Sequence, residues 1–175
     1  MCGIAGILST SSITSSMASK LDAMQYHLTH RGPDAQGKFA SPSKKALFAH
    51  TRLSIIDLSD DAAQPMSIGR YTITYNGEIY NYQILKQQLS DLGHRFISHS
   101  DTEVIVKLYQ EYGVNCLNHL RGMFAFVIWD EETHCAFAAR DPLGIKPFYY
   151  FNNDQLCAFS SEALTQMKKR RVDHY

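Results

Sequence analysis

The residue with the most unusual chemical position is Cys2, which directly follows the initiator methionine. If Met1 is removed, this residue carries both a thiol nucleophile and a free α-amine, whose usual pKa is about 7.7–8.0. Such an amine is partly neutral near neutral pH and can accept the thiol proton during attack on a carbonyl. The alternative is a small apolar residue that enters a strand. Position alone favours that alternative, and the other motifs of the chain reverse it.

Asn76 and Gly77 are a candidate pair of donors for the oxyanion that forms when a thiol attacks an amide. Asn76 offers a side-chain amide, and Gly77 offers a backbone N–H that no side chain shields. Asn-Gly is also the commonest pair in a tight hairpin turn. A strand predicted over residues 71–75 ends at this pair, so a turn remains the alternative.

Three charged residues suit the recognition of a free amino acid. Arg52 interrupts an apolar stretch, where its guanidinium can hold a carboxylate through two parallel hydrogen bonds. Asp101 and Glu78 can face an α-ammonium group. The alternatives are an arginine on a surface strand and, for Asp101, an N-cap or first-turn acid of the helix that follows.

Eight short motifs follow one another along the chain: CGIAG (2–6), HRGPD (30–34), RLSIID (52–57), QPM (64–66), NGEIYN (76–81), SDTE (100–103), GMFAF (122–126) and RDPLGIKP (140–147). With these motifs the chain resembles the N-terminal glutaminase domain of glutamine-hydrolysing asparagine synthetases, which are class II glutamine amidotransferases. The resemblance runs from Cys2 to about Glu162. It implies an α+β fold of the N-terminal-nucleophile hydrolase type, a four-layer αββα sandwich of two antiparallel sheets.

The resemblance also implies a role for each candidate residue. Cys2 would be the nucleophile, with its freed amine as the base, and Asn76 with Gly77 would form the oxyanion hole. Arg52 would hold the glutamine α-carboxylate, while Glu78 and Asp101 would hold the α-ammonium. Backbone from Leu53 through Ile55 and Ile56 would line the pocket.

The implied reaction is hydrolysis of glutamine to glutamate and ammonia through a γ-glutamyl thioester. It needs no cofactor, because ATP and Mg²⁺ would serve only a synthetase domain, whose Ser-Gly-Gly-x-Asp-Ser loop this sequence lacks. The expected partners are glutamine and a synthetase domain or subunit that receives the ammonia. Two alternatives remain open, a standalone γ-glutamyl amidohydrolase and a non-catalytic module that senses glutamine or docks to a partner.

The order of patterns along the chain predicts an α+β layered fold. Helical spacing occurs over residues 17–28, 84–89 and 104–112, and short apolar runs predict the strands, at 3–8, 47–50, 53–56, 71–75, 123–129, 135–139, 148–151 and 156–159. Residues 130–133 predict a hairpin connection. Residues 161–169 predict a short terminal helix, so we divide the chain into a domain over 1–162 and a helix with a basic tail over 163–175.

Composition narrows the class of protein further. The chain has 175 residues, of which 45% are hydrophobic, and its 17 basic and 17 acidic side chains cancel. This length suits one domain, and the charge balance favours neither nucleic acid nor a membrane surface as a partner. The apolar stretch over 4–8 is too short for a signal peptide, so we expect a cytoplasmic protein. No cysteine spacing suits a metal site, and Cys116, Cys135 and Cys157 are expected to be buried.

Three further motifs have structural interpretations. With Gly-Pro beside them, His30 and Arg31 are expected to order a loop. Arg140 and Asp141 are expected to form an ion pair that ties a loop. The aromatic run over residues 148–151 is expected to pack in the core or against another domain, because no basic groove accompanies it.

Overall fold

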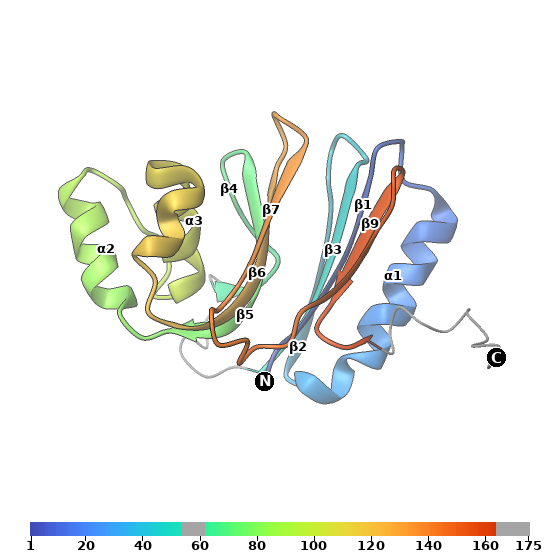
Figure 1. Ribbon diagram of the computed structural model, residues 1–175, viewed down its shortest axis with the longest axis horizontal. Helices are drawn as coiled ribbons and strands as arrows, with labels where there is room; N and C mark the ends of the chain where they lie inside the picture. Colours follow the sequence, from blue (N-terminus) through green and yellow to red (C-terminus); the bar gives the residue numbers. More distant parts are fainter. Residues whose placement is uncertain (54–61, 164–175) are drawn as a thin grey trace.

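Two antiparallel sheets lie face to face between two helical layers in the computed structural model, which describes residues 1–53 and 62–163 (Figure 1). One helix covers the outer face of the first sheet, and two helices cover the outer face of the second. The predicted four-layer αββα sandwich is therefore confirmed. A layered fold arises because each sheet has two apolar faces, and both must be covered.

The first sheet has the strand order β2-β3-β1-β9-β8. Its strands, in chain order, are β1 (Gly3–Ser9), β2 (Ala35–Ala40), β3 (Ala46–Arg52), β8 (Tyr149–Asn152) and β9 (Leu156–Ser160). Helix α1 (Ser15–His27) packs on its outer face. Strand β1 is central and reads as an almost continuous apolar run, because Ile4 faces the other sheet and Ala5 and Ile7 face α1.

The second sheet has the order β4-β5-β6-β7. Its strands are β4 (Met66–Ile68), β5 (Tyr71–Ile79), β6 (Gly122–Asp130) and β7 (Cys135–Arg140), and its outer layer holds α2 (Tyr82–Asp91) and α3 (Asp101–Tyr112). Short 3₁₀ turns occur at Thr29–Arg31 and Gly113–Asn118. The largest apolar cluster lies between this sheet and its helices, where Ile73, Leu89 and Ile105 are fully buried.

Most predicted elements occur where hydrophobic spacing placed them. Strands β2 and β4 were not predicted, because β2 is an exposed edge strand with a polar sequence and β4 has only three residues. In α2, Leu85 and Leu89 are buried, but Ile84 is 63% exposed because the helix buries only the stripe at i, i+4. The hairpin predicted at 130–133 joins β6 to β7.

Three predictions at other positions are wrong or fall outside the described residues. Cys135 is exposed rather than buried, because it begins the edge strand β7, whereas Cys116 is buried and Cys157 is partly buried. The predicted strand 53–56 is not confirmed at Leu53, which follows the end of β3, and its remainder lies outside the described residues. So does the predicted terminal helix from residue 164 onward.

Candidate active site

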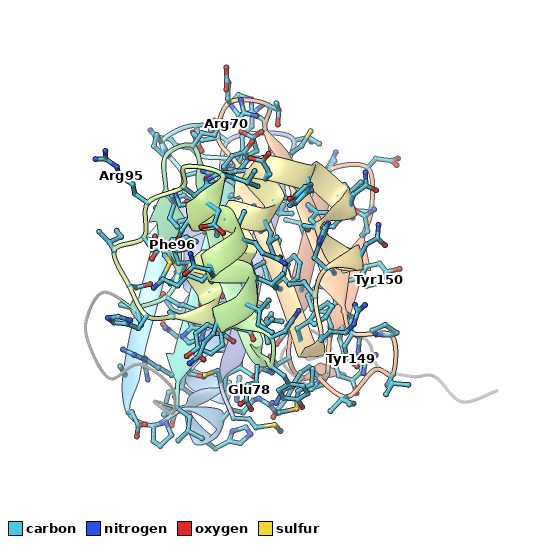
Figure 2. All side chains as sticks on the ribbon, turned by 90° about the vertical axis from the view of Figure 1, so that its left-hand side faces the viewer. Arg70, Glu78, Arg95, Phe96, Tyr149 and Tyr150 are labelled. Atoms are coloured by element: carbon cyan, nitrogen blue, oxygen red, sulfur yellow. The ribbon has the colours of Figure 1, made fainter. Side chains whose placement is uncertain are left out.

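A cavity of about 350 Å³ is lined by residues of both sheets and by Met1. The N-terminus lies at the lower end of the molecule in Figure 1. Figure 2 shows Glu78 at the same lower end. Every candidate site residue that the structure describes lines this cavity: Cys2, Arg52, Leu53, Asn76, Gly77, Glu78 and Asp101. Ile55 and Ile56 lie outside the described residues.

Cys2 is placed by the start of strand β1. Because Gly3 pairs with Thr51 of β3, Cys2 lies beside the end of that strand. The Leu53 N–H donates to the Cys2 Sγ at 3.3 Å, and the Leu53 carbonyl lies 3.6 Å from the same sulfur. On the other side of the backbone, Arg31 Nε donates to the Cys2 carbonyl at 3.1 Å. Leu53 thus holds the thiol of Cys2, and Arg31 holds its backbone, where Cys2 lines the cavity.

A cluster around Glu162 fixes the loop that holds the Cys2 carbonyl. Arg31 Nη1 lies 3.1 Å from Glu162 Oε1, and His30 Nε2 lies 2.9 Å from it. Burial opposes ionisation of Glu162, but hydrogen bonds from Arg31 and His30 outweigh it and lower the pKa of that carboxyl. These contacts fit the predicted role of His30 and Arg31 in ordering a loop.

Asn76 and Gly77 lie inside strand β5, paired with Ala125 and Phe124 of β6, so the alternative of a hairpin turn is wrong. The Tyr75 N–H donates to Gln64 Oε1 at 2.7 Å on the edge of β5 that faces away from β6, and the Ile79 N–H also points to that edge. Alternate N–H groups of a strand share one edge. The Gly77 N–H, midway between them, therefore points to this edge, on which the cavity lies.

Asn76 carries a buried donor that nothing in the described part of the chain satisfies. The side chain is 2% exposed, and its Nδ2 has no hydrogen-bond partner there. A buried, unpaired donor typically costs about 1–3 kcal/mol. Gly77 is needed for a different reason, since a Cβ at this position would lie 2.3 Å from the Met123 carbonyl oxygen. Asn76 therefore supplies a donor without a described partner, and Gly77 allows β5 and β6 to approach closely.

Asp101 is anchored to the open edge of β5. It lies in the first turn of α3, whose N-cap is Ser100, and its Oδ2 accepts from the Tyr75 hydroxyl at 2.8 Å and from the Ile79 N–H at 3.0 Å. Burial raises the pKa of Asp101, although these two hydrogen bonds act against that shift. Of the alternatives for Asp101, the structure supports a first-turn acid and excludes the N-cap.

Arg52 and Glu78 bring charge to the cavity from opposite sheets. Arg52 is the last residue of β3 and pairs with Ala35, whereas Glu78 lies in β5 and pairs with Met123. With Asp101, the cavity therefore has one arginine and two acids on its walls. This charge pattern matches the carboxylate and the ammonium of an amino acid.

The residues that line the cavity without a role predicted from the sequence include His50, Gln64 and Lys146. His50 is buried, its Nε2 lies 3.2 Å from the Tyr75 carbonyl, and burial lowers its pKa to about 4. Lys146 is only 4% exposed, although it belongs to the motif at 140–147. The sequence signal that could have marked Lys146 as a site residue is its position between two apolar residues, Ile145 and Pro147.

Arg140 and Asp141 tie the loop after β7, but they do so separately. Arg140 donates to the carbonyls of Gly144 and Lys146, and Asp141 accepts from the backbone N–H groups of Ile145 and Lys146. No ion pair joins Arg140 and Asp141 within residues 1–53 and 62–163, so the predicted pairing is wrong. The reason is that both side chains reach backbone groups of the turn that follows them.

In the described ranges, no group of three or more His, Cys, Asp or Glu side chains is arranged to hold a metal ion. Among the same residues, no helix is both long enough and apolar enough to cross a membrane.

The family model for the glutamine amidotransferase domain matches residues 1–174. The chain therefore belongs to the glutamine amidotransferase domain family, and its resemblance to the glutaminase domain of asparagine synthetases is confirmed. Among its relatives is asparagine synthetase [glutamine-hydrolyzing] 3 of Bacillus subtilis (strain 168), 40% identical over 166 residues, which cover 93% of this chain and 26% of that protein.

Other relatives lie at the same level of identity. Asparagine synthetase B [glutamine-hydrolyzing] of Escherichia coli (strain K12) is 40% identical over 85% of this chain and 26% of its own length. Amidase chry2 of Gibberella zeae is 40% identical over 86% of this chain and 24% of its own length. The chain thus spans about a quarter of the length of these relatives.

A solved structure shows the same fold. Glutamine phosphoribosylpyrophosphate amidotransferase from B. subtilis, complexed with ADP and GMP, superposes with a TM-score of 0.75 at 24% identity. The match covers 94% of this chain and 42% of that one. It confirms the predicted class of fold, an α+β sandwich of two antiparallel sheets.

Proposed function

We propose that this chain, once Met1 is removed, hydrolyses glutamine to glutamate and ammonia with Cys2 as the nucleophile. The observation that carries the proposal is one cavity shared by the Cys2 thiol, the Asn76 amide, whose Nδ2 has no partner among the described residues, and the edge of β5 to which the Gly77 N–H points. A nucleophile beside two hydrogen-bond donors is the arrangement that acyl transfer requires.

The first half of the reaction forms a thioester. The Cys2 thiol gives its proton to the freed α-amine, and Sγ attacks the carbon of the substrate carboxamide. The carbonyl oxygen becomes an oxyanion that accepts hydrogen bonds from Asn76 Nδ2 and the Gly77 N–H. The C–N bond then breaks, the amine returns the proton to the leaving nitrogen, and ammonia departs.

The second half releases glutamate. Water attacks the γ-glutamyl thioester with the same amine as base, a second oxyanion forms in the same hole, and the C–S bond breaks. The thiol recovers its proton. No step needs a metal ion or a cofactor, because both half-reactions move only protons and an acyl group.

Charged side chains hold the substrate in place. Arg52 binds the α-carboxylate, while Glu78 and Asp101 bind the α-ammonium, so the carboxamide is directed toward Cys2. Leu53 lines the pocket beside the thiol, and we extend the same role to Ile55 and Ile56, which lie outside the described residues. Selection of both charged ends distinguishes free glutamine from a glutamine residue within a peptide.

We further propose that the ammonia passes to a synthetase domain or subunit that uses ATP and Mg²⁺. The support is that two relatives are named glutamine-hydrolyzing asparagine synthetases and are about four times as long as the matched region. Co-purification of a synthetase subunit, or its presence on the same chain, would support this acceptor. Glutaminase activity with no such partner would instead support a standalone amidohydrolase.

The test of the glutaminase is a paired measurement on one preparation. Intact mass reports whether Met1 is gone, and an enzymatic assay reports glutamate released from glutamine. Cys2→Ala should abolish release while glutamine binding, measured by calorimetry, persists. Cys135→Ala is the matched control, because Cys135 is exposed on β7 and does not line the cavity. Normal turnover by the Cys2→Ala protein would disprove the mechanism.

A further inference from the structure

Lys146 is a buried lysine whose side chain lines the cavity beside Cys2. Within the described part of the chain, its Nζ makes one hydrogen bond, to the Met1 Sδ at 3.2 Å. A thioether is a weak acceptor, and a buried ammonium normally has a charged or strongly polar partner. Met1 supplies this weak contact, and the proposed function requires that Met1 be removed beforehand.

The position of Lys146 does not depend on Met1, because its backbone is clamped on both sides. Asp141 Oδ2 accepts from the Lys146 N–H at 3.0 Å, and Arg140 Nε donates to the Lys146 carbonyl at 2.5 Å. Asp141 also accepts from the N–H of Phe124, which pairs with Gly77 across β5 and β6. The lysine is therefore fixed to the strand pair that carries the proposed oxyanion hole.

Lys146 interacts electrostatically with the site. Burial and the charge of Arg31 lower the pKa of Lys146, whereas Cys2, Glu78 and Asp141 act in the opposite direction and favour its ammonium form. Its Nζ contacts the side chain of Met1, the residue whose carbonyl carbon is bonded to the Cys2 nitrogen. Loss of Met1 removes this contact and frees the amine of Cys2, which lines the same cavity as Lys146.

Other charged groups around Cys2 also contribute to the electrostatic potential at this residue. The remaining cations are Arg31 from the 3₁₀ turn, which is paired with Glu162, and Arg52 from β3. The acids are Glu78 from β5 and Asp101 from α3.

Two further titratable groups face the same cavity and are neutral near pH 7. Burial lowers the pKa of His50 to about 4, and burial with the charge of Asp101 raises the pKa of Tyr75. Among the described cations of the cavity, Lys146 is the one in hydrogen-bond contact with Met1.

We propose that Lys146 is a positioning residue for the nucleophile: after Met1 is removed, its ammonium lies beside the N-terminus and promotes loss of one proton from Cys2. The inference rests on the proposed function, in which trimmed Cys2 is the nucleophile. The thiol and the α-ammonium of trimmed Cys2 can each lose one proton, and the reactive form has lost one of these two. A neighbouring cation favours that loss whichever of the two groups keeps the remaining proton.

The test measures the protonation of Cys2 without glutamine turnover. Trimmed protein is alkylated with iodoacetamide over a range of pH, and mass spectrometry follows the peptide that contains Cys2. In Lys146→Met we expect the midpoint of the rate profile to move up by about one pH unit, the size of shift that one nearby charge typically causes. Lys146→Arg, which keeps the charge, should stay within a few tenths of a unit of the parent.

Matched variants make the outcome decisive. Lys38→Met removes an exposed lysine that pairs with Asp22 outside the cavity, and it should leave the midpoint unchanged. Lys146→Gln is a second neutral replacement, for use if the methionine variant does not fold. An unchanged midpoint in a folded neutral variant, or an equal shift in Lys146→Arg, would overturn the proposal.

A second readout uses the reaction itself. In the neutral variants the acid limb of kcat/KM for glutamine should move to higher pH, with about a tenfold loss on that limb and recovery on the alkaline plateau. A loss of equal size at every pH would mean a purely structural role and would contradict the inference. If no variant hydrolyses glutamine, the alkylation profile still decides the role of Lys146, while the proposed function fails separately.

Discussion

The backbone of Leu53 contacts the Cys2 sulfur through both of its polar groups. Its N–H donates to Sγ at 3.3 Å, and its carbonyl lies 3.6 Å from the same atom. One residue thus offers a donor to the thiolate and an acceptor to the thiol. The sulfur is held in place in either protonation state, which is what a nucleophile needs when its proton leaves and returns.

The buried amide of Asn76 provides the first prediction. Asn76→Ala should lower kcat for glutamine hydrolysis about 100–1,000-fold with little change in KM, because an oxyanion-hole donor acts in the transition state. Steady-state kinetics on trimmed protein measures both constants. Asn152→Ala, at the exposed end of β8, is the control and should behave like the parent. A rise in KM with unchanged kcat would place Asn76 in ground-state binding instead.

The second prediction concerns the close approach of β5 and β6. A Cβ at Gly77 would lie 2.3 Å from the Met123 carbonyl oxygen, so Gly77→Ala must separate the two strands. We expect a loss of about 1–3 kcal/mol in the free energy of unfolding, typical of overpacking, together with a fall in kcat. Urea denaturation and kinetics on the same preparation test this. Parental stability in Gly77→Ala would show that the strands yield without cost.

Two acids on one helix should separate binding from stability. Asp101 lines the cavity, whereas Glu103 accepts hydrogen bonds from the N–H groups of Ile97 and Ser98 and from the Ser98 hydroxyl. Asp101→Asn should raise the KM for glutamine about tenfold or more, because it removes the charge that we propose faces the substrate ammonium.

Glu103→Gln should lower Tm with a smaller effect on KM, since Glu103 holds a loop and does not line the cavity. Thermal unfolding and KM measured on both variants form a crossed design. The assignment of Asp101 would fail if the two substitutions had the same effect on KM.

His50 should make stability depend on pH. Its pKa is about 4 in the folded protein because it is buried, against an ordinary value of 6.5. The unfolded chain therefore binds a proton that the folded chain does not. The contribution of His50 to the free energy of unfolding is fully present above pH 6.5 and is lost as the pH falls toward 4. Between about pH 7 and pH 5 this loss is about 2 kcal/mol.

Urea denaturation at pH 7 and pH 5 should show a steeper pH dependence of the free energy of unfolding in the parent than in His50→Gln. Equal slopes would contradict the buried, neutral state of His50.

Local patterns were enough to predict most of the fold. Strand β1 and helix α3 lie where apolar spacing predicted them, and the hairpin between β6 and β7 follows a cluster of turn residues. Such elements are encoded locally, because burial of one face imposes a period on the sequence. Edge strands such as β2 bury little surface, carry no such period and were missed.

Pairing partners were harder to predict from the sequence. Asn-Gly suits a turn, yet Asn76 and Gly77 lie within a strand because β6 pairs with both residues. Arg140 and Asp141 have opposite charges next to each other, yet each binds backbone of the loop instead of the other. In both cases a long-range or backbone partner outweighs the local preference.

The sequence by itself determined the chemical inventory of this protein, namely a cysteine at position 2, a pair of amide donors, one arginine and two acids in motifs of fixed order. The type and order of residues can be read from a chain whose fold is unknown. Only the tertiary structure decided that Asn76 Nδ2 lies buried without a described partner and that Lys146 touches Met1. Residues so far apart in sequence meet only when both sheets pack, so their contacts and their shared desolvation exist only in the folded chain.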